Sequence, residues 1–115
     1  MARPASPFLL TDPLSPFERF EILRLAACAI WADQEVAPAE RTYLDALARE
    51  LEIDGAAADD LLSFPQALED VAPETVSPAA ARRARAAVLG AIAADREIRD
   101  DEMDFFFVLD ARLPR

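Results

Sequence analysis

The 115-residue sequence contains no histidine and no lysine, and it has only two glycines and one cysteine. Without histidine the chain can form neither a typical zinc site nor a nucleophile activated by an imidazole base. It also has no glycine-rich phosphate loop. With these chemistries excluded, only a carboxylate pair could catalyse a reaction, so we expect no catalytic residues and a protein that is not an enzyme.

The missing lysines leave twelve arginines against 22 acidic residues, which gives a net charge of −10. Proteins that bind nucleic acid rely on basic residues to neutralise phosphates. The charge therefore argues against a nucleic-acid partner. It is compatible with cations or with basic protein partners, although acidity also serves solubility.

The single cysteine, Cys28, lies in an apolar segment and cannot form a disulfide within the chain, as is typical of proteins in a reducing cytoplasm. The longest apolar runs, residues 25–32 and 86–94, are too short to cross a bilayer. The first residues lack the apolar region of a signal peptide. We therefore expect a cytoplasmic protein without membrane insertion.

The composition predicts an all-α fold. Hydrophobic residues make up 53% of the chain and charged residues 30%, which is typical of a globular domain. Many Ala and Leu residues and few glycines favour helices. We expect one compact helical bundle over residues 15–115, preceded by an extended arm at residues 1–14 whose three prolines disfavour a helix.

The sequence repeats itself. Residues 29–40 (AIWADQEVAPAE) return 62 positions later as residues 91–102 (AIAADREIRDDE). Downstream, Leu44, Leu47 and Leu51 match Phe106, Leu109 and Leu113. The pattern predicts an internal duplication, with copies at about 16–52 and 78–113. Each copy begins with a long helix that loses all charge near its end, and we expect these two central helices to cross in the buried core, with Gly90 at their close approach.

Local signals predict where the helices begin and end. Ser15, Pro16 and Glu18 form the pattern of a capping box at the start of the first helix, and Pro38 opens a second helix that runs to about Glu52. We expect Gly55 to end that helix in a left-handed conformation. Two short helices, 57–62 and 65–71, should link the copies, and the last helix should run from Asp100 to about Leu113.

Each copy carries three acidic residues, which stand at a helix end, in the turn that follows and in the first turn of the next helix. The six candidate ligands are Asp33, Glu35, Glu40, Asp95, Glu97 and Glu102. Carboxylates gathered in this way suit Ca²⁺ or Mg²⁺, although the spacing is not that of an EF-hand. A second interpretation remains open, because glutamates near a helix start can cap backbone amides and aspartates can hold a turn without any ion.

This repeated motif resembles that of the TerB-like family, which includes the tellurite-resistance protein TerB and the N-terminal domain of the co-chaperone DjlA. The resemblance extends from about Phe17 to Leu113. It implies an all-helical domain with a divalent-cation site on the six acidic residues, acting with a protein partner in tellurite resistance or stress response. A metal-independent interaction module, related to the co-chaperone domain, is the alternative. The sequence departs from the family at Gln34 and Arg96, where the family often has glycine.

Overall fold

The computed structural model describes residues 14–32, 35–68, 71–94 and 100–114. Over these residues the chain forms helices and no β-strand, which confirms the predicted all-α fold. The α-helices are α2 (Pro16–Trp31), α3 (Pro38–Glu50), α4 (Gly55–Ser63), α5 (Pro78–Ala93) and α6 (Asp100–Arg112), and a short 3-10 turn, η2, covers Pro73–Thr75. The predicted arm lies largely outside the described residues.

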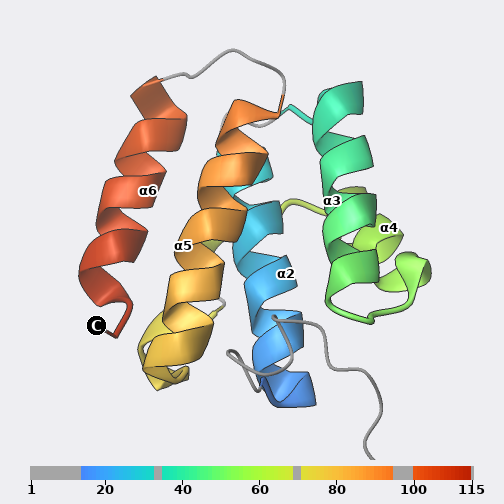
Figure 1. Ribbon diagram of the computed structural model, residues 1–115. Coiled ribbons are helices and arrows are strands. Elements are labelled where there is room, and N and C mark those ends of the chain that lie inside the picture. The colour runs from blue at the N-terminus through green and yellow to red at the C-terminus, as the bar shows by residue number, and fades with distance from the viewer. Residues whose placement is uncertain (1–13, 33–34, 69–70, 95–99, 115) are drawn as a thin grey trace, which may run out of the picture.

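Helices α2 and α5 form the centre of the bundle and make the most extensive contact between any two elements. Helices α3 and α6 flank this pair on opposite sides (Figure 1). Helix α4 packs against α3 and α2 and lies behind α3 in Figure 1, whereas α5 is in front of α2. The predicted packing of the two long helices is therefore present.

The two pairs of long helices match in length and position. Helices α2 and α5 have 16 residues each, and α3 and α6 have 13 residues each. Pro78 stands 62 positions after Pro16, and Asp100 stands 62 positions after Pro38. The spacing of the repeated sequence is thus also the spacing of the helix boundaries.

The prediction that both central helices are buried holds for α2 and only in part for α5. In α2 every residue from Leu25 to Ile30 is buried. In α5, by contrast, Ala86, Leu89 and Ala93 are exposed, and Leu89 has 42% of its surface in solvent. The difference arises because α4 packs against α2, while α5 has no corresponding element over it in the described part of the chain.

Gly90 does not serve the contact between the two central helices. A Cβ atom at this position would lie 2.3 Å from the hydroxyl oxygen of Tyr43 on α3. That hydroxyl donates a hydrogen bond to the carbonyl of Ala87, at 2.8 Å, and burial raises the pKa of Tyr43 above its usual value. Gly90 therefore provides room for a tyrosine that ties α3 to α5.

The end of α3 also differs from the prediction. The left-handed residue is Glu52, with φ of 60°, and the amide of Ile53 donates to the carbonyl of Ala48 as in a Schellman motif. Arg19 holds the Glu52 carboxylate at 2.7 Å. Gly55 has no positive φ; it begins α4, whose N-cap is Asp54.

The connection from α4 to α5 contains η2, and the structure shows no helix at residues 65–67 of the predicted 65–71 helix. Instead, side chains from the flanking helices hold this segment. Arg112 on α6 makes a two-pronged contact with Glu74, at 3.0 and 3.1 Å. Buried Glu21 on α2 accepts a hydrogen bond from the backbone of Ala72.

Candidate functional site

The two acidic motifs lie at the same end of the bundle. The C-termini of α2 and α5 and the N-termini of α3 and α6 all point to this end (Figure 1). Glu35, Glu40 and Glu102 belong to the described residues, whereas Asp33, Asp95 and Glu97 lie outside them. Only the glutamates Glu35, Glu40 and Glu102 can therefore be located in the structure.

Glu40 and Glu102 occupy matching places and are both buried. Each is the third residue of its helix, and they expose 1% and 0% of their surface. In both side chains the Oε2 oxygen is enclosed by the protein. Taking a carboxylate out of water costs several kcal/mol unless hydrogen bonds or an opposite charge offset it. Two such groups at equivalent positions are the most unusual feature of the acidic motifs.

Part of the environment of Glu40 is the capping arrangement that the sequence allows. Its Oε1 accepts the backbone N–H of Ala37 at 2.8 Å, which supplies the glutamate half of a capping box. Ala37 has no side-chain oxygen to supply the other half. One oxygen of Glu40 therefore stabilises the start of α3, and the other faces the protein interior. Glu35, in contrast, is exposed.

The two motifs do not form one group in the described structure. Helices α3 and α6 lie on opposite sides of the α2–α5 pair (Figure 1), so Glu40 and Glu102 belong to separate environments. Within the four described ranges, no three His, Cys, Asp or Glu side chains gather closely enough to hold an ion. The described residues therefore do not by themselves form a cation site, and Asp33, Asp95 and Glu97 lie outside them.

A further carboxylate, that of Glu18, joins the two central helices at the other end of the bundle. In α2 it completes the predicted capping box with Ser15: Ser15 Oγ accepts from the Glu18 amide, at 3.1 Å, and Glu18 Oε1 accepts from the Ser15 amide, at 3.2 Å. In α5 the N-cap is Ser77, and the position three residues later is Ala80, which cannot complete a box. The amide of Ser77 donates instead to Glu18 Oε2, at 2.8 Å.

Glu18 therefore caps both central helices. The hydrogen bonds from Ser77 are the main reason that the pKa of this carboxyl is below its usual value. Sequence reasoning found its role in α2, because that box is local. The role of Glu18 in α5 was not predicted, because Glu18 and Ser77 are 59 residues apart in the sequence. The available signal was Ser77 itself, a serine N-cap that has Ala80 where a capping box needs a glutamate.

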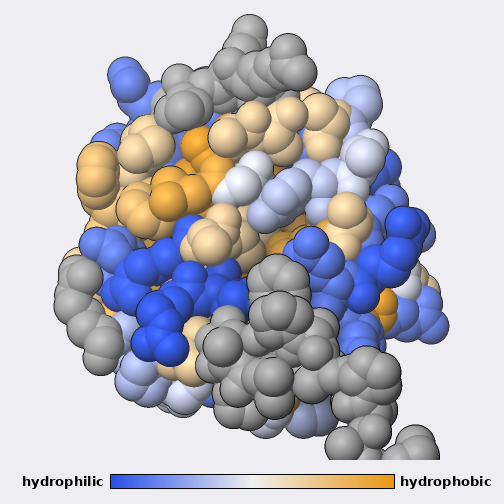
Figure 2. Space-filling view, in the orientation of Figure 1, coloured by the Kyte–Doolittle hydropathy of each residue, from blue (hydrophilic) through white to orange (hydrophobic). Residues whose placement is uncertain are grey.

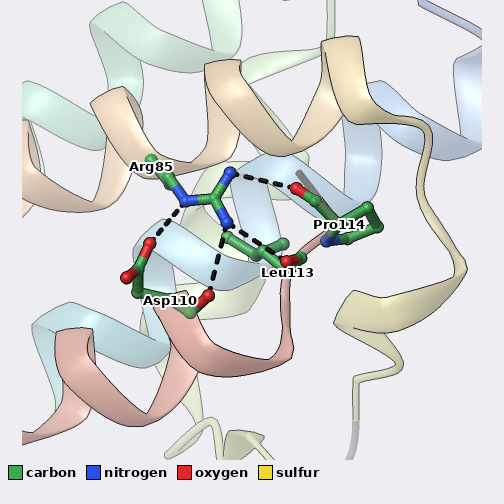
Figure 3. Close-up of polar contacts among 4 residues, drawn as sticks. All are labelled: Arg85, Asp110, Leu113 and Pro114. Atoms are coloured by element: carbon green, nitrogen blue, oxygen red, sulfur yellow. Dashed lines mark hydrogen bonds and ion pairs between the residues drawn. The ribbon is translucent and has the colours of Figure 1, made fainter.

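Arg85 fixes the C-terminal end of α6 to α5. Its Nε donates to Asp110 Oδ1 at 2.5 Å, and its two terminal nitrogens donate to the backbone carbonyls of Asp110, Leu113 and Pro114 at 3.1 to 3.3 Å (Figure 3). Carbonyls at a helix C-terminus lack partners within the helix, and a cation there is favoured by the helix dipole. The planar guanidinium fills a structural role that a lysine could not fill.

A polar cleft of about 230 Å³ lies between α3 and α4. It is lined by Asp45, Arg49, Ile53, Gly55 and Asp59. The mixed charges at its walls match no catalytic arrangement and show mainly how α4 packs beside α3. No helix in the described part of the chain is long and apolar enough to cross a bilayer.

Comparisons with known proteins gave no match: no family, no curated protein and no solved structure is detectably similar to the chain. Any function proposed for the chain therefore rests on its own residues and on the resemblance of its repeated motif to that of the TerB-like family.

Proposed function

We propose that the chain is a duplicated, TerB-like helical domain that is not an enzyme and that binds Ca²⁺ or Mg²⁺ at its acidic turns. The place of action would be the cytoplasm, in tellurite resistance or another stress response, through contact with a protein partner. The resemblance of the motif supports the family, and the equal lengths and spacing of the helix pairs support the duplication.

The burial of Glu40 and Glu102 carries the proposal. A capping role alone does not require a buried side chain, because most capping glutamates are solvated at the surface. Here each glutamate directs a carboxylate into the protein at the point where an acidic turn enters the next helix. A hard cation held by that carboxylate and by the aspartate of the turn would offset the burial of the glutamate's negative charge.

The first copy should bind more tightly than the second. Arg96 places a positive charge between Asp95 and Glu97, whereas the first copy has the neutral Gln34 at this position. A cation next to a metal site weakens binding by repulsion. The two turns should therefore differ in affinity for the same ion.

Substitution of the buried glutamates tests the proposal. In Glu40→Gln the amide oxygen can still accept from Ala37, so the cap of α3 remains while the negative charge is removed. Thermal melts and ¹H–¹⁵N spectra with added Ca²⁺ or Mg²⁺ should show that the wild type responds, that Glu40→Gln loses the tighter response and that Glu102→Gln loses the weaker one. A cation at a hundred times its Kd would stabilise the fold by about 2.7 kcal/mol.

Glu50→Gln is the matched control, since Glu50 is an exposed glutamate on the same helix. It removes an equal charge away from the turn and should leave the response to cations unchanged. A wild-type protein whose melting temperature and spectra ignore both ions would refute the cation site. The capping interpretation of the acidic residues would then remain.

The second candidate is a metal-independent helical interaction module, as in the co-chaperone domain. One observation favours it: large apolar side chains are exposed on the outer faces of α5 and α6, with 42% of Leu89, 62% of Phe107 and 55% of Val108 in solvent. Exposed apolar side chains that lie together mark binding surfaces more often than single ones do.

A further inference from the structure

The position of α4 shows which surface of the first copy is covered. On α3, Arg41 pairs with Asp59 of α4 at 3.9 Å, and Asp45 and Arg49 line the cleft with Asp59. On α2, the indole nitrogen of Trp31 donates to the carbonyl of Leu61 at 3.1 Å. One turn before Trp31, Ala27 is completely buried. Helix α4 therefore lies over α2 and α3 along one side of each.

The matching surface of the second copy is found by adding 62 to these positions and to Arg24, which stands three residues before Ala27 on α2. It consists of Ala86, Leu89 and Ala93 on α5 and Met103, Phe107 and Ala111 on α6, and we call it the α5–α6 face. Five of the six residues are exposed and Met103 is partly buried. Figure 2 shows hydrophobic residues over the upper part of α5 and α6, with hydrophilic residues below them.

The two surfaces differ in chemistry more than in exposure. In the first copy, the corresponding positions hold Arg24, Ala27, Trp31, Arg41, Asp45 and Arg49; four of the six are charged, and of these Arg41 and Arg49 stay exposed beside α4. In the open copy, all six are apolar. A surface that only faces water has no physical reason to be the more apolar of the two. The α5–α6 face therefore has the character of a surface that another element covers.

From this comparison, which depends on the proposed duplication, we infer that the α5–α6 face binds a short amphipathic helix of a partner protein, in the place that α4 takes on the first copy. The partner helix would present aliphatic residues to Leu89 and Phe107, as α4 presents buried Ala58, Leu61 and Leu62 to the first copy. This is the helix-in-groove mode of recognition.

Charge indicates the polar side of the partner helix. Asp100, Asp101 and Asp104 are exposed on the first turns of α6, next to the α5–α6 face, and the whole chain has a net charge of −10. Arg85, near the other end of the face, is already paired with Asp110. A helix whose polar side is basic is therefore favoured over an acidic one, and it would associate faster at low salt.

The test uses the full chain and a synthetic helical peptide of about 14 residues, with leucines along one side and lysines along the other. Its control has the same composition in an order that spreads the leucines around the helix. In ¹H–¹⁵N spectra, we expect the first peptide to shift the resonances of the α5–α6 face and the control peptide to bind at least about tenfold more weakly. All titrations contain EDTA, so a failure of the proposed cation site would not affect the result.

Substitutions locate the binding. Leu89→Ser and Phe107→Ser should each lower the affinity for the peptide by about tenfold. Both variants should fold, because the substitutions replace exposed side chains. Phe64→Ser is the matched control, since Phe64 is 70% exposed and directly follows α4, which packs against α3 and α2. It should leave the affinity unchanged.

Three results would overturn the inference. The first is a set of shifts that lie elsewhere or that respond equally to both peptides. The second is a dimer, seen by sedimentation, that Leu89→Ser dissociates, since the occupant would then be a second copy of this chain. The third is a change in the α5–α6 resonances of the peptide-free protein after Leu9→Ser, which would identify the chain's own N-terminal segment as the occupant.

Discussion

Substitution of Gly90 provides a sharp test of the packing between α3 and α5. In Gly90→Ala the new methyl group would meet the Tyr43 hydroxyl at 2.3 Å, a distance that the tyrosine can relieve only by moving away. The hydrogen bond to Ala87 would then be lost, at about 1 kcal/mol, and the half-buried ring would lose contacts worth about 1–2 kcal/mol. Alanine in a helix regains about 1 kcal/mol over glycine.

We therefore expect Gly90→Ala to destabilise the protein by about 1–2 kcal/mol, measured by urea unfolding. The same substitution in a Tyr43→Ala background should stabilise it by about 1 kcal/mol, because the obstacle is gone and only the helix preference remains. Gly55→Ala is the control, since a Cβ atom at Gly55 meets nothing within 4 Å. A stabilised Gly90→Ala protein, or an effect of the same sign in both backgrounds, would refute the packing argument.

Two other substitutions test a partly buried and a buried charge, those of Arg85 and Glu21. Arg85→Lys keeps the charge, but a lysine cannot reach all four acceptors on Asp110, Leu113 and Pro114. We therefore expect the free energy of unfolding, measured in urea, to fall by about 2–3 kcal/mol. A decrease below about 0.5 kcal/mol would contradict the role of the guanidinium. Glu21 has a pKa raised chiefly by burial, so its folded pKa exceeds the unfolded value and the stability of the wild type falls as pH rises through that interval. Glu21→Gln should therefore be more stable than the wild type near pH 7 and similar to it near pH 4, and the reverse order would show that Arg24, at 3.6 Å, outweighs burial.

The features that could be predicted from the sequence are those set by neighbouring residues. Ser15, Pro16 and Glu18 specify the start of α2 within four positions, and the helix forms there with the predicted capping box. Glu52 was missed because a left-handed conformation is uncommon for a residue other than glycine, although the backbone bonds of the Schellman motif form around it. Its carboxylate pairs with Arg19, which is distant in sequence. Local propensity alone had favoured Gly55.

The uncharged segment of α5 shows a different limit. Residues 86–94 resemble residues 25–32 in lacking charge, and this similarity predicted a buried helix in both places. Burial depends on what covers a helix, however, and α4 packs against α2 but makes no comparable contact with α5. The available signal was Trp31, which reaches α4 through a hydrogen bond, and its replacement by Ala93 in the second copy.

The acidic motif was predictable in part. Glu40 was expected near a helix start and caps α3 there, but its complete burial follows from the packing of α3 on α2 and α5, which no local pattern specifies. The cation site itself stays a prediction, since Asp33, Asp95 and Glu97 lie outside the described residues.

The shared cap at Glu18 has a consequence for how the protein unfolds. One carboxylate supplies the glutamate half of the capping box to two helices that begin 62 residues apart in sequence. Ser77 still caps α5 with its own hydroxyl, which accepts from the amide of Ala80 at 3.2 Å, so the second half of the chain borrows only the glutamate. Loosening of α2 at this end would expose amides of both helices at once, and hydrogen exchange at Ser15 and Ser77 should therefore report a single opening event rather than two.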